Sequence, residues 1–351
     1  MAAGFEAVQF GIFDQNDQGP YPLAEQYEAR LRLIEFYDRA GFRTYHMSEH
    51  HSTPLNLAPS PSVFLSAVAQ RTRRLRFGAL VYVLPAHHPL RLAEEICMLD
   101  HLSRGRIEVG FGRGASPHEL AYFGVNPDVA PAMYVEAYDV IMQALTQDEV
   151  NFSGKHYRFT KVPIDVRPLQ RPHPPLWYAV PVPDGAAWPA QNGINIVCGG
   201  PLARVREITD RYRAEWTAAG HDPDRIPLLG INRFVLAADT DREAMALGRR
   251  AWPLFYRSFM KLWKLHGTQP RNIRLPEDFD TLVAGGGAIA GSPGTLRDRI
   301  RRMTEEAGTN YFISQFSFGD LNREEVLHSA GIFAREMLPD AGVRASQAAE
   351  G

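Results

Sequence analysis

The sequence contains few cysteines and no long apolar run. Its two cysteines, Cys97 and Cys198, lie far apart without metal-binding or redox spacing, so we expect two buried thiols and no disulfide. No stretch approaches the roughly 18 apolar residues of a membrane span. The first residues also lack a basic region followed by an apolar one, as a secretory signal would have. These absences predict a cytoplasmic protein.

The sequence also has no excess of charge of either sign. Its 351 residues carry a formal net charge of -2, with 22% charged and 45% hydrophobic residues. A nearly neutral chain offers no electrostatic footprint for polyanions, so we expect neither nucleic acid nor a membrane surface as a partner. The composition is ordinary for a globular enzyme, and the length fits one large α/β barrel.

Apolar periodicity alternates along the chain between strand-like and helix-like runs, which indicates βα units and a parallel sheet. About eight units can be counted, the number that closes a barrel. We therefore predict an α/β fold, a TIM-like (β/α)8 barrel with insertions, in one domain over residues 1–340, with 341–351 a flexible tail. The expected strands cover residues 5–13, 43–48, 75–84, 106–109, 176–180, 194–197, 228–237 and 311–315. The expected helices cover residues 23–40, 61–71, 89–102, 202–219, 241–264, 295–307 and 323–337, with one more that follows Pro131 and ends at Met142.

Two segments interrupt this repeat. Residues 150–160 predict an excursion hairpin around Ser153-Gly154-Lys155, inserted between barrel elements. Residues 265–291 combine proline-containing turns with three consecutive glycines and are too long for an ordinary connection. Long irregular segments in compact domains often cover active sites, so we predict a lid there.

His46, Glu49 and His50 match the H-x-x-E-H pattern, in which two histidines bind zinc and the glutamate activates water. That site requires a helix to bring both histidines onto one metal. The flanking residues, which include Pro54, have no helical period. We therefore expect no metal centre.

Residues 110–115 read as G-x-G-x-x-A after a strand, the dinucleotide fingerprint of Rossmann domains. That fingerprint expects a helix at once and an acidic residue about 20 residues later at a strand end. Here Pro117 follows closely and Asp128 lies in a proline-flanked loop, which argues against it. The glycines either let the backbone approach a ligand or simply form a sharp turn, and the sequence leaves both open.

Two histidine pairs follow predicted strands, at His50-His51 and His87-His88. Adjacent residues of an extended chain point to opposite sides, so at most one of each pair can face a common pocket. A packed, hydrogen-bonded histidine is the ordinary case, and a carboxylate neighbour favours acid–base work. Glu49 favours His50 for that role.

These motifs together resemble the bacterial luciferase-like, flavin-dependent monooxygenase family. The similarity covers most of the chain. It is densest in SEHH (48–51), VLPAHHPLRLAEE (83–95), LDHLSRGR (99–106) and GRG (112–114), and it resumes in NFSGKHY (151–157), GSP (291–293) and FAREMLP (333–339).

The resemblance implies a barrel, usually dimeric, that binds reduced FMN at its C-terminal mouth and uses O2 to oxygenate an aldehyde, ketone or similar small substrate. His50, with Glu49 beside it, matches the family histidine near the flavin that is associated with acid–base work. Leu80-Val81 falls where members often carry a non-prolyl cis peptide that supports the isoalloxazine ring. No second cofactor fingerprint is present, so we expect a separate reductase to supply the reduced flavin.

Arg113, between Gly112 and Gly114, matches the arginine that holds the FMN phosphate. Members commonly add a serine-like donor after the fifth strand and a second basic residue at the helix after the fourth.

This chain has Pro181 and Val182, followed by Asp184, at the first of those places and Pro131 at the second. Proline has no N–H to offer a phosphate, and Asp184 would repel it. Two alternatives follow from these departures: an oxidoreductase that uses the deazaflavin F420 for hydride transfer, and a non-catalytic flavin-binding homologue.

Overall fold

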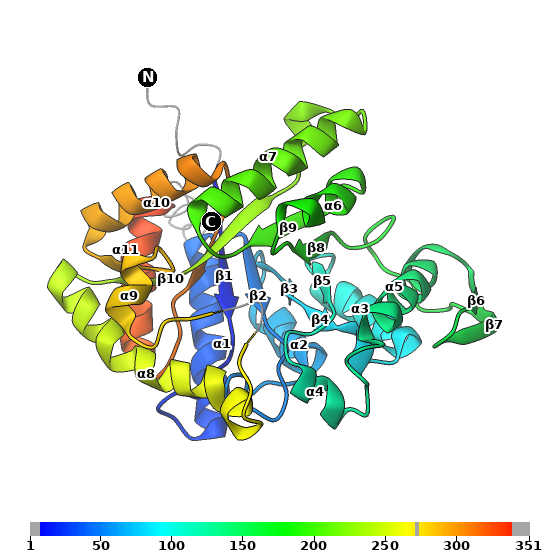
Figure 1. The fold of residues 1–351 in the computed structure, drawn as a ribbon, viewed down its shortest axis with the longest axis horizontal. Coiled ribbons are helices and arrows are strands. Elements are labelled where there is room, and N and C mark those ends of the chain that lie inside the picture. The colour runs from blue at the N-terminus through cyan, green and yellow to red at the C-terminus, as the bar shows by residue number, and fades with distance from the viewer. Residues whose placement is uncertain (1–7, 271–273, 339–351) are drawn as a thin grey trace, which may run out of the picture.

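The computed structural model describes residues 8–270 and 274–338, and their strands form a central parallel sheet (Figure 1). The strands of this sheet are β1 (Gln9–Asp14), β2 (Thr44–Met47), β3 (Arg76–Ala79), β4 (Tyr82–Val83), β5 (Val109–Gly112), β8 (Leu176–Ala179), β9 (Asn195–Cys198), β10 (Leu229–Ala237), β11 (Ala288–Gly291) and β12 (Tyr311–Gln315). Their order in space is β3-β2-β1-β12-β10-β9-β8-β5-β4, with β11 added beside β10. All their pairings are parallel.

The sheet closes on itself. β3 and β4 stand at the two ends of the strand order, yet only two residues separate them in the chain. Phe77 of β3 also bridges in parallel to Ile107, just before β5. The predicted TIM-like barrel is therefore confirmed.

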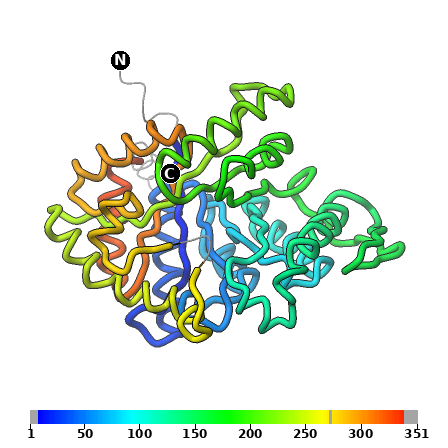
Figure 2. The backbone as a smooth tube through the Cα atoms, viewed as in Figure 1, coloured from blue at the N-terminus to red at the C-terminus, as the bar shows by residue number. Residues whose placement is uncertain are grey.

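Helices surround the strands as an outer layer (Figure 2). They are α1 (Leu23–Ala40), α2 (Pro61–Arg71), α3 (Pro89–Ser103), α4 (Pro117–Tyr122), α5 (Ala130–Thr146), α6 (Ala187–Gln191), α7 (Leu202–Ala218), α8 (Asp241–Leu265), α9 (Phe279–Ala284), α10 (Pro293–Ala307) and α11 (Arg323–Met337), with short 3-10 turns η1 (Leu84–Ala86), η2 (Pro183–Ala186) and η3 (Pro223–Arg225). Strand residues alternate between this layer and the barrel interior. Phe13, Trp177 and Ile313, from three different strands, meet in the inner apolar cluster.

The N-terminal end of the barrel is filled by buried polar side chains. Glu108, just before β5, accepts hydrogen bonds from Trp177 Nε1 at 2.6 Å and Arg76 Nε at 2.6 Å, and pairs with Arg43 at 2.9 Å. Burial raises the pKa of Glu108, but Arg43 and Arg76 lower it further, so the carboxylate stays charged. This network, which we call the floor, lies at the end where all the strands begin.

The expected strand over residues 75–84 is wrong as one element. The Leu80-Val81 peptide is cis and separates β3 from β4, and the last residue of the expected strand enters η1. The strand expected over 106–109 starts later, at Val109, because Arg106 turns to bind Thr72 Oγ1 at 2.7 Å and Leu75 O at 2.8 Å. The residues expected to begin the first strand, 5–7, lie outside the described part of the chain, as does the tail over 341–351.

A helix that the sequence analysis missed follows the glycine cluster. Pro117 opens α4, because proline is tolerated in a first helical turn, and the Ser116 hydroxyl accepts the Glu119 amide at 3.4 Å. The argument that Pro117 excludes a helix there was wrong. The Rossmann interpretation still fails, because the sheet closes into a barrel.

The second half of the proposed lid is regular structure, which corrects the expectation of one irregular segment. Phe279 and Leu282 are buried side chains of α9, and β11 pairs with β10. Periodicity did not reveal these elements because each is only a few residues long. Residues 271–273 lie outside the described part of the chain, and a lid function stays a prediction.

The predicted hairpin is confirmed. β6 (Glu149–Ser153) and β7 (Arg158–Pro163) form a separate antiparallel sheet, which Figure 1 shows at the edge of the molecule, away from the barrel strands. Glu136 of α5 accepts backbone hydrogen bonds from three residues of the turn between β6 and β7, with N···O distances from 2.8 to 3.0 Å.

Cys97 and Cys198 are free and buried, as expected. None of the described helices combines the length and apolarity needed to cross a membrane.

Candidate active site at the barrel mouth

The residues that the sequence analysis singled out gather at one end of the barrel. Because the strands are parallel, their carboxyl ends share one mouth. Glu49 and His50 follow β2, the Leu80-Val81 peptide follows β3, and Arg113 follows β5.

Glu49 is completely enclosed. Its carboxylate lies 2.8 Å from His51 Nε2 and 2.8 Å from His87 Nε2, and it accepts the Val83 amide at 2.8 Å. Burial raises the pKa of Glu49, but the hydrogen bonds with the two histidines lower it further, to about 2. For His87 burial lowers the pKa and the bond with Glu49 raises it, with a net increase. Glu49 is thus a buried anion that ties the loop after β2 to the strand beyond the cis peptide.

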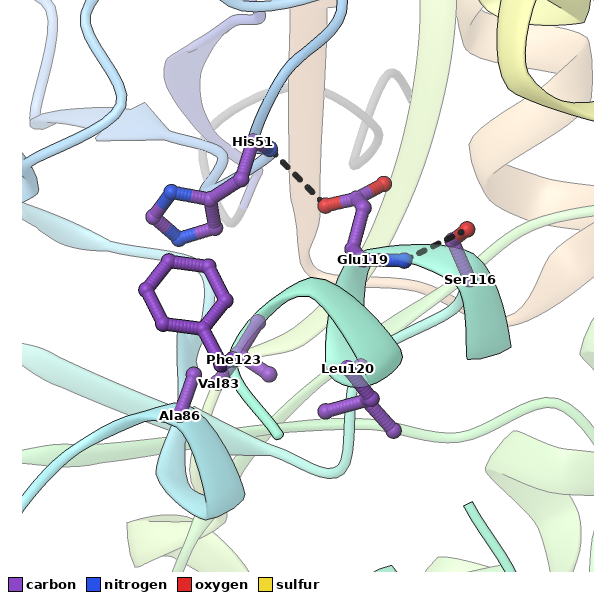
Figure 3. A pocket seen from close by; sticks show the side chains of 8 residues that line it. His51, Val83, Ala86, Ser116, Glu119, Leu120 and Phe123 are labelled. Carbon is purple, nitrogen blue, oxygen red and sulfur yellow. Dashed lines mark hydrogen bonds between the residues drawn. The ribbon is translucent and has the colours of Figure 1, made fainter. Parts of the chain in front are cut away.

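Glu119 of α4 is the carboxylate partner of His50, and the sequence analysis missed it. Its Oε1 lies 3.2 Å from His50 Nδ1, and its Oε2 accepts the His51 amide at 2.9 Å (Figure 3). Ser116 and Glu119 have the S-x-x-E spacing of a capping box, the signal that could have revealed this helix start. Glu119 therefore fixes both the ring and the backbone of this histidine pair.

His51 is committed to packing. Its ring stands edge-on to Phe123 with a centroid distance of 4.6 Å, as Figure 3 shows. The small pocket beside it is lined by His51, Val83, Ala86, Gly114, Ser116, Glu119, Leu120 and Phe123. Each ring of the pair has one nitrogen in a hydrogen bond, Nδ1 of His50 with Glu119 and Nε2 of His51 with Glu49, and the His51 ring is in addition packed against Phe123.

The expected non-prolyl cis peptide is present at Leu80-Val81. Gly112 faces it, and a Cβ on Gly112 would lie 2.3 Å from Val81 Cγ2. Gly114 has a φ of 88°, the left-handed region that favours glycine, and its Cβ would lie 2.9 Å from Val83 Cγ1. The two glycines thus serve different needs, a close approach at Gly112 and a turn at Gly114.

Arg113 is exposed at the rim of the mouth. Its guanidinium makes no hydrogen bond or ion pair with any side chain of residues 8–270 or 274–338, so its donors are available. Tyr134 of α5 lies near it: burial and the neighbouring Tyr178 raise the pKa of Tyr134, whereas Arg113 lowers it. These tyrosine hydroxyls are donors that the sequence analysis did not find, because they come from α5 and β8.

The departures from the family pattern lie on the surface. Pro131 is in the first turn of α5, and Pro181 and Val182 precede η2; all three are exposed. The rim therefore carries no serine-like donor at these places, whereas Tyr134 is a hydroxyl on which the charge of Arg113 acts.

The zinc interpretation has no structural basis. His46 lies in β2, not on a helix, and its Nε2 lies 3.2 Å from the Tyr311 hydroxyl in the barrel interior. Burial lowers the pKa of His46 to about 3. The described residues contain no group of three side chains arranged to hold a metal ion.

Comparison with known proteins agrees with the fold. The chain is 41% identical over 335 residues to an uncharacterised protein of Sinorhizobium fredii, covering 95% of this chain and 98% of that one. It is 30% identical to limonene 1,2-monooxygenase of Rhodococcus erythropolis, covering 97% and 88%.

Two solved structures share the architecture. Monooxygenase RslO1 from Streptomyces bottropensis superposes with a TM-score of 0.85 at 28% identity, covering 95% of this chain and 99% of that one. The oxygenating constituent of 3,6-diketocamphane monooxygenase from Pseudomonas putida, solved in complex with FMN, does so with a TM-score of 0.79 at 20% identity, covering 95% and 98%.

The family model described as luciferase-like monooxygenase matches residues 8–311, which include every site residue above. Its named members among these relatives are monooxygenases, oxidoreductases that incorporate oxygen. The chain belongs to the luciferase-like monooxygenase family.

Proposed function

We propose that this chain is a flavin-dependent monooxygenase that uses reduced FMN and O2 to oxygenate a small organic substrate such as an aldehyde or ketone. One observation carries the proposal: His50, the Leu80-Val81 cis peptide and Arg113 follow the carboxyl ends of β2, β3 and β5 at one mouth. Family membership supports the reaction class, and the FMN complex of a protein with the same fold supports the cofactor.

The residues present fit FMN. Arg113 has a free guanidinium, which can bind a phosphate through two parallel hydrogen bonds, and the Tyr134 hydroxyl can add a third donor. Gly112 lets the Val81 side chain pack directly against β5, since a Cβ there would collide with Val81 Cγ2, and this keeps the cis peptide next to the strand that leads to Arg113. Reduced FMN, when bound, supplies the electrons for the reaction with O2.

His50 is the residue that we assign to proton handling. Its Nδ1 is engaged by the Glu119 carboxylate, which places a proton on Nδ1 and leaves Nε2 as the proton acceptor. Glu49 has no atom free to touch a substrate, so we assign it a positioning role for the loop that carries His50.

We also infer that a separate reductase supplies the flavin, since the sequence has no second cofactor fingerprint. The similarity to a protein named as an oxygenating constituent supports this. For the homodimer that family resemblance implies, the supporting feature is a row of exposed apolar side chains on neighbouring helices: Val63 of α2 at 71%, and Met98 and Leu102 of α3 at 56% and 49%.

The test combines the protein with a flavin reductase, NADH, FMN and carbonyl substrates, and measures product with and without oxygen. We expect product only with oxygen, and a fall of about 100-fold or more in His50→Ala, the usual size of acid–base contributions. His328→Ala is the matched control, because His328 is a surface histidine paired with Asp239.

Three outcomes would contradict parts of this proposal. Full activity in His50→Ala would remove its catalytic role. Oxygen-independent turnover with F420 would identify the deazaflavin alternative. Tight binding of FMN without any oxygen consumption would identify a non-catalytic flavin-binding protein.

A further inference from the structure

Three amide side chains line the barrel interior near the mouth: Gln15, just after β1, Asn232 of β10 and Gln315 of β12. We call them the amide triad. Each has a buried polar atom without a hydrogen-bond partner among the described residues, namely Oε1 of Gln15, Oδ1 of Asn232 and Nε2 of Gln315. Their strands are neighbours in the sheet, so the three atoms belong to one wall.

Strand alternation directs this wall inward. Phe13 and Ile313 belong to the inner apolar cluster, and side chains two residues further along a strand point the same way, which places Gln15 and Gln315 inside. A Cβ on Gly230 would lie 3.3 Å from Ile313 Cδ1, so that position also faces inward, and Asn232 follows it by two residues. The register pairs Asn232 directly with Ile313.

The inward-facing position and the unsatisfied atoms together distinguish the triad from other buried amides of this fold. Asn16 also has an unpartnered Oδ1 among the described residues, but its Nδ2 donates to the Tyr45 hydroxyl at 3.2 Å. Asn56 is also buried, yet its Nδ2 donates to Ser48 O at 2.8 Å and its Oδ1 accepts the Ala58 amide at 2.7 Å. Buried amide atoms normally have such partners, and exceptions call for an explanation. Three exceptions on one wall of a candidate active site indicate that a ligand completes their hydrogen bonds.

The triad lies across the barrel from the proposed flavin wall. In the strand order, β1, β12 and β10 are separated from β5 and β4 by β9 and β8 on one side, and from β3 by β2 on the other. The cis peptide and Gly112 therefore face the triad across the interior, and a substrate would lie between them.

We propose that the amide triad binds the substrate, an inference that rests on the proposed function. The substrate is then a small polar molecule with an N–H or O–H donor beside a carbonyl acceptor, as in a lactam. One of the two amide oxygens would accept from the donor, and Gln315 Nε2 would donate to the carbonyl. The pyrimidine edge of the flavin has the same chemistry, so the test must separate the two ligands.

The test compares δ-valerolactam with cyclohexanone, which has the same ring size and no N–H donor. Their affinities for the FMN-loaded protein are measured by titration calorimetry. We expect the lactam to bind about tenfold more tightly than the ketone, the effect of one or two net hydrogen bonds. Asn232→Leu and Gln315→Met should each bring the ratio towards one and leave the FMN dissociation constant unchanged.

Ser314→Ala is the matched control, because Ser314 adjoins Gln315, is buried, and has a hydroxyl on the opposite face of β12 that finds no partner within residues 8–270 and 274–338. Its lactam preference should match that of the wild type. Gln15→Leu, at the half-buried rim, replaces Asn232→Leu if that variant does not fold.

Equal binding of the two probes to the wild type, or an unchanged ratio in the triad variants, would overturn the proposal. Weaker FMN binding with an unchanged ratio would assign the triad to the flavin, which also overturns it. Oxygen consumption with reduced FMN alone is measured in parallel and tests the proposed function independently of either probe.

Discussion

At the scale of single residues, the proposed function assigns the FMN phosphate to the exposed guanidinium of Arg113. We expect Arg113→Ala to raise the dissociation constant of FMN about 10- to 100-fold, because hydrogen bonds to a charged phosphate are lost. Arg113→Lys should recover part of the affinity, since an ammonium cannot make the paired contact. Fluorescence titration of FMN measures both effects.

Riboflavin, which lacks the phosphate, separates a phosphate contact from a change in the ring site. Its affinity should be the same in the wild type and in Arg113→Ala. Arg91→Ala is the control, because Arg91 is an exposed arginine paired with Glu95 on α3. An equal loss of FMN and riboflavin affinity would show that Arg113 does not hold the phosphate.

The single residues also show how far the sequence can be interpreted. Family resemblance supplied His50, Arg113 and the cis peptide at Leu80-Val81, which periodicity alone could not have found. Glu119 escaped because its partner is distant, 69 positions away at His50. The amide triad escaped because its residues come from β10, β12 and the end of β1, which are far apart in the sequence. Which strand residue faces the barrel interior depends on register, and that is settled only when the sheet closes.

At the scale of elements, the short helix α4 holds the loop that carries His50. We expect Glu119→Ala to release both the His50 ring and the His51 amide, and to lower kcat about 10- to 100-fold, because a small displacement of a catalytic group is costly. Hydrogen exchange should speed up at the His51 amide in the variant. If Glu119 had only a structural role, the substitution would change hydrogen exchange or the free energy of unfolding and leave kcat unchanged.

Glu136→Ala is the matched control for α4. Glu136 also accepts several backbone amides, but in the turn between β6 and β7, away from the mouth. The same substitution there should loosen the hairpin and leave kcat unchanged. Unchanged kcat in Glu119→Ala would end the positioning role proposed for this carboxylate.

Elements with a full amphipathic period were predictable. The helices Leu23–Ala40 and Arg323–Met337 have the bounds that periodicity predicts, as has the strand Tyr311–Gln315. The failures share a cause: α4, α9 and β11 are too short to show a period, and the break after β3 comes from one cis peptide. Hydrophobic periodicity is judged over a window of many residues and does not resolve features this short.

At the scale of the whole molecule, a buried ion cluster joins the first and last units of the barrel. Asp17, after β1, lies 3.3 Å from Arg30 of α1 and accepts the Gly319 amide, beyond β12, at 2.7 Å. Asp14 shares the same arginine at 3.6 Å. One buried cation thus faces two buried carboxyl groups, and burial raises the pKa of Asp17 from 3.8 to about 7.

This raised pKa predicts how stability depends on pH. The folded protein holds the Asp17 proton more tightly than the unfolded chain, so the contribution of this group is complete below pH 3.8 and is lost as the pH rises through about 7. The free energy of unfolding of the wild type, relative to Asp17→Asn, should therefore fall between these values, by at most about 1.4 kcal/mol per pH unit. Urea unfolding at several pH values measures it.

Asp210→Asn serves as the control for this pH dependence, because Asp210 is an exposed carboxylate paired with Arg206 within one helix. It should leave the slope of stability against pH unchanged. A wild-type slope that persists in Asp17→Asn would show that other groups determine it.

The floor of the barrel has a kinetic consequence. Glu108, Trp177 and the two arginines that bind the carboxylate form a network across the end where the strands begin, which leaves the mouth as the end of the barrel through which a ligand can pass. A molecule bound at the amide triad and a flavin held by Arg113 would then enter and leave by the same route. The ligand that binds second then blocks the exit of the ligand that bound first. Under the proposed function, flavin and substrate therefore bind and leave in an order set by the shape of the barrel.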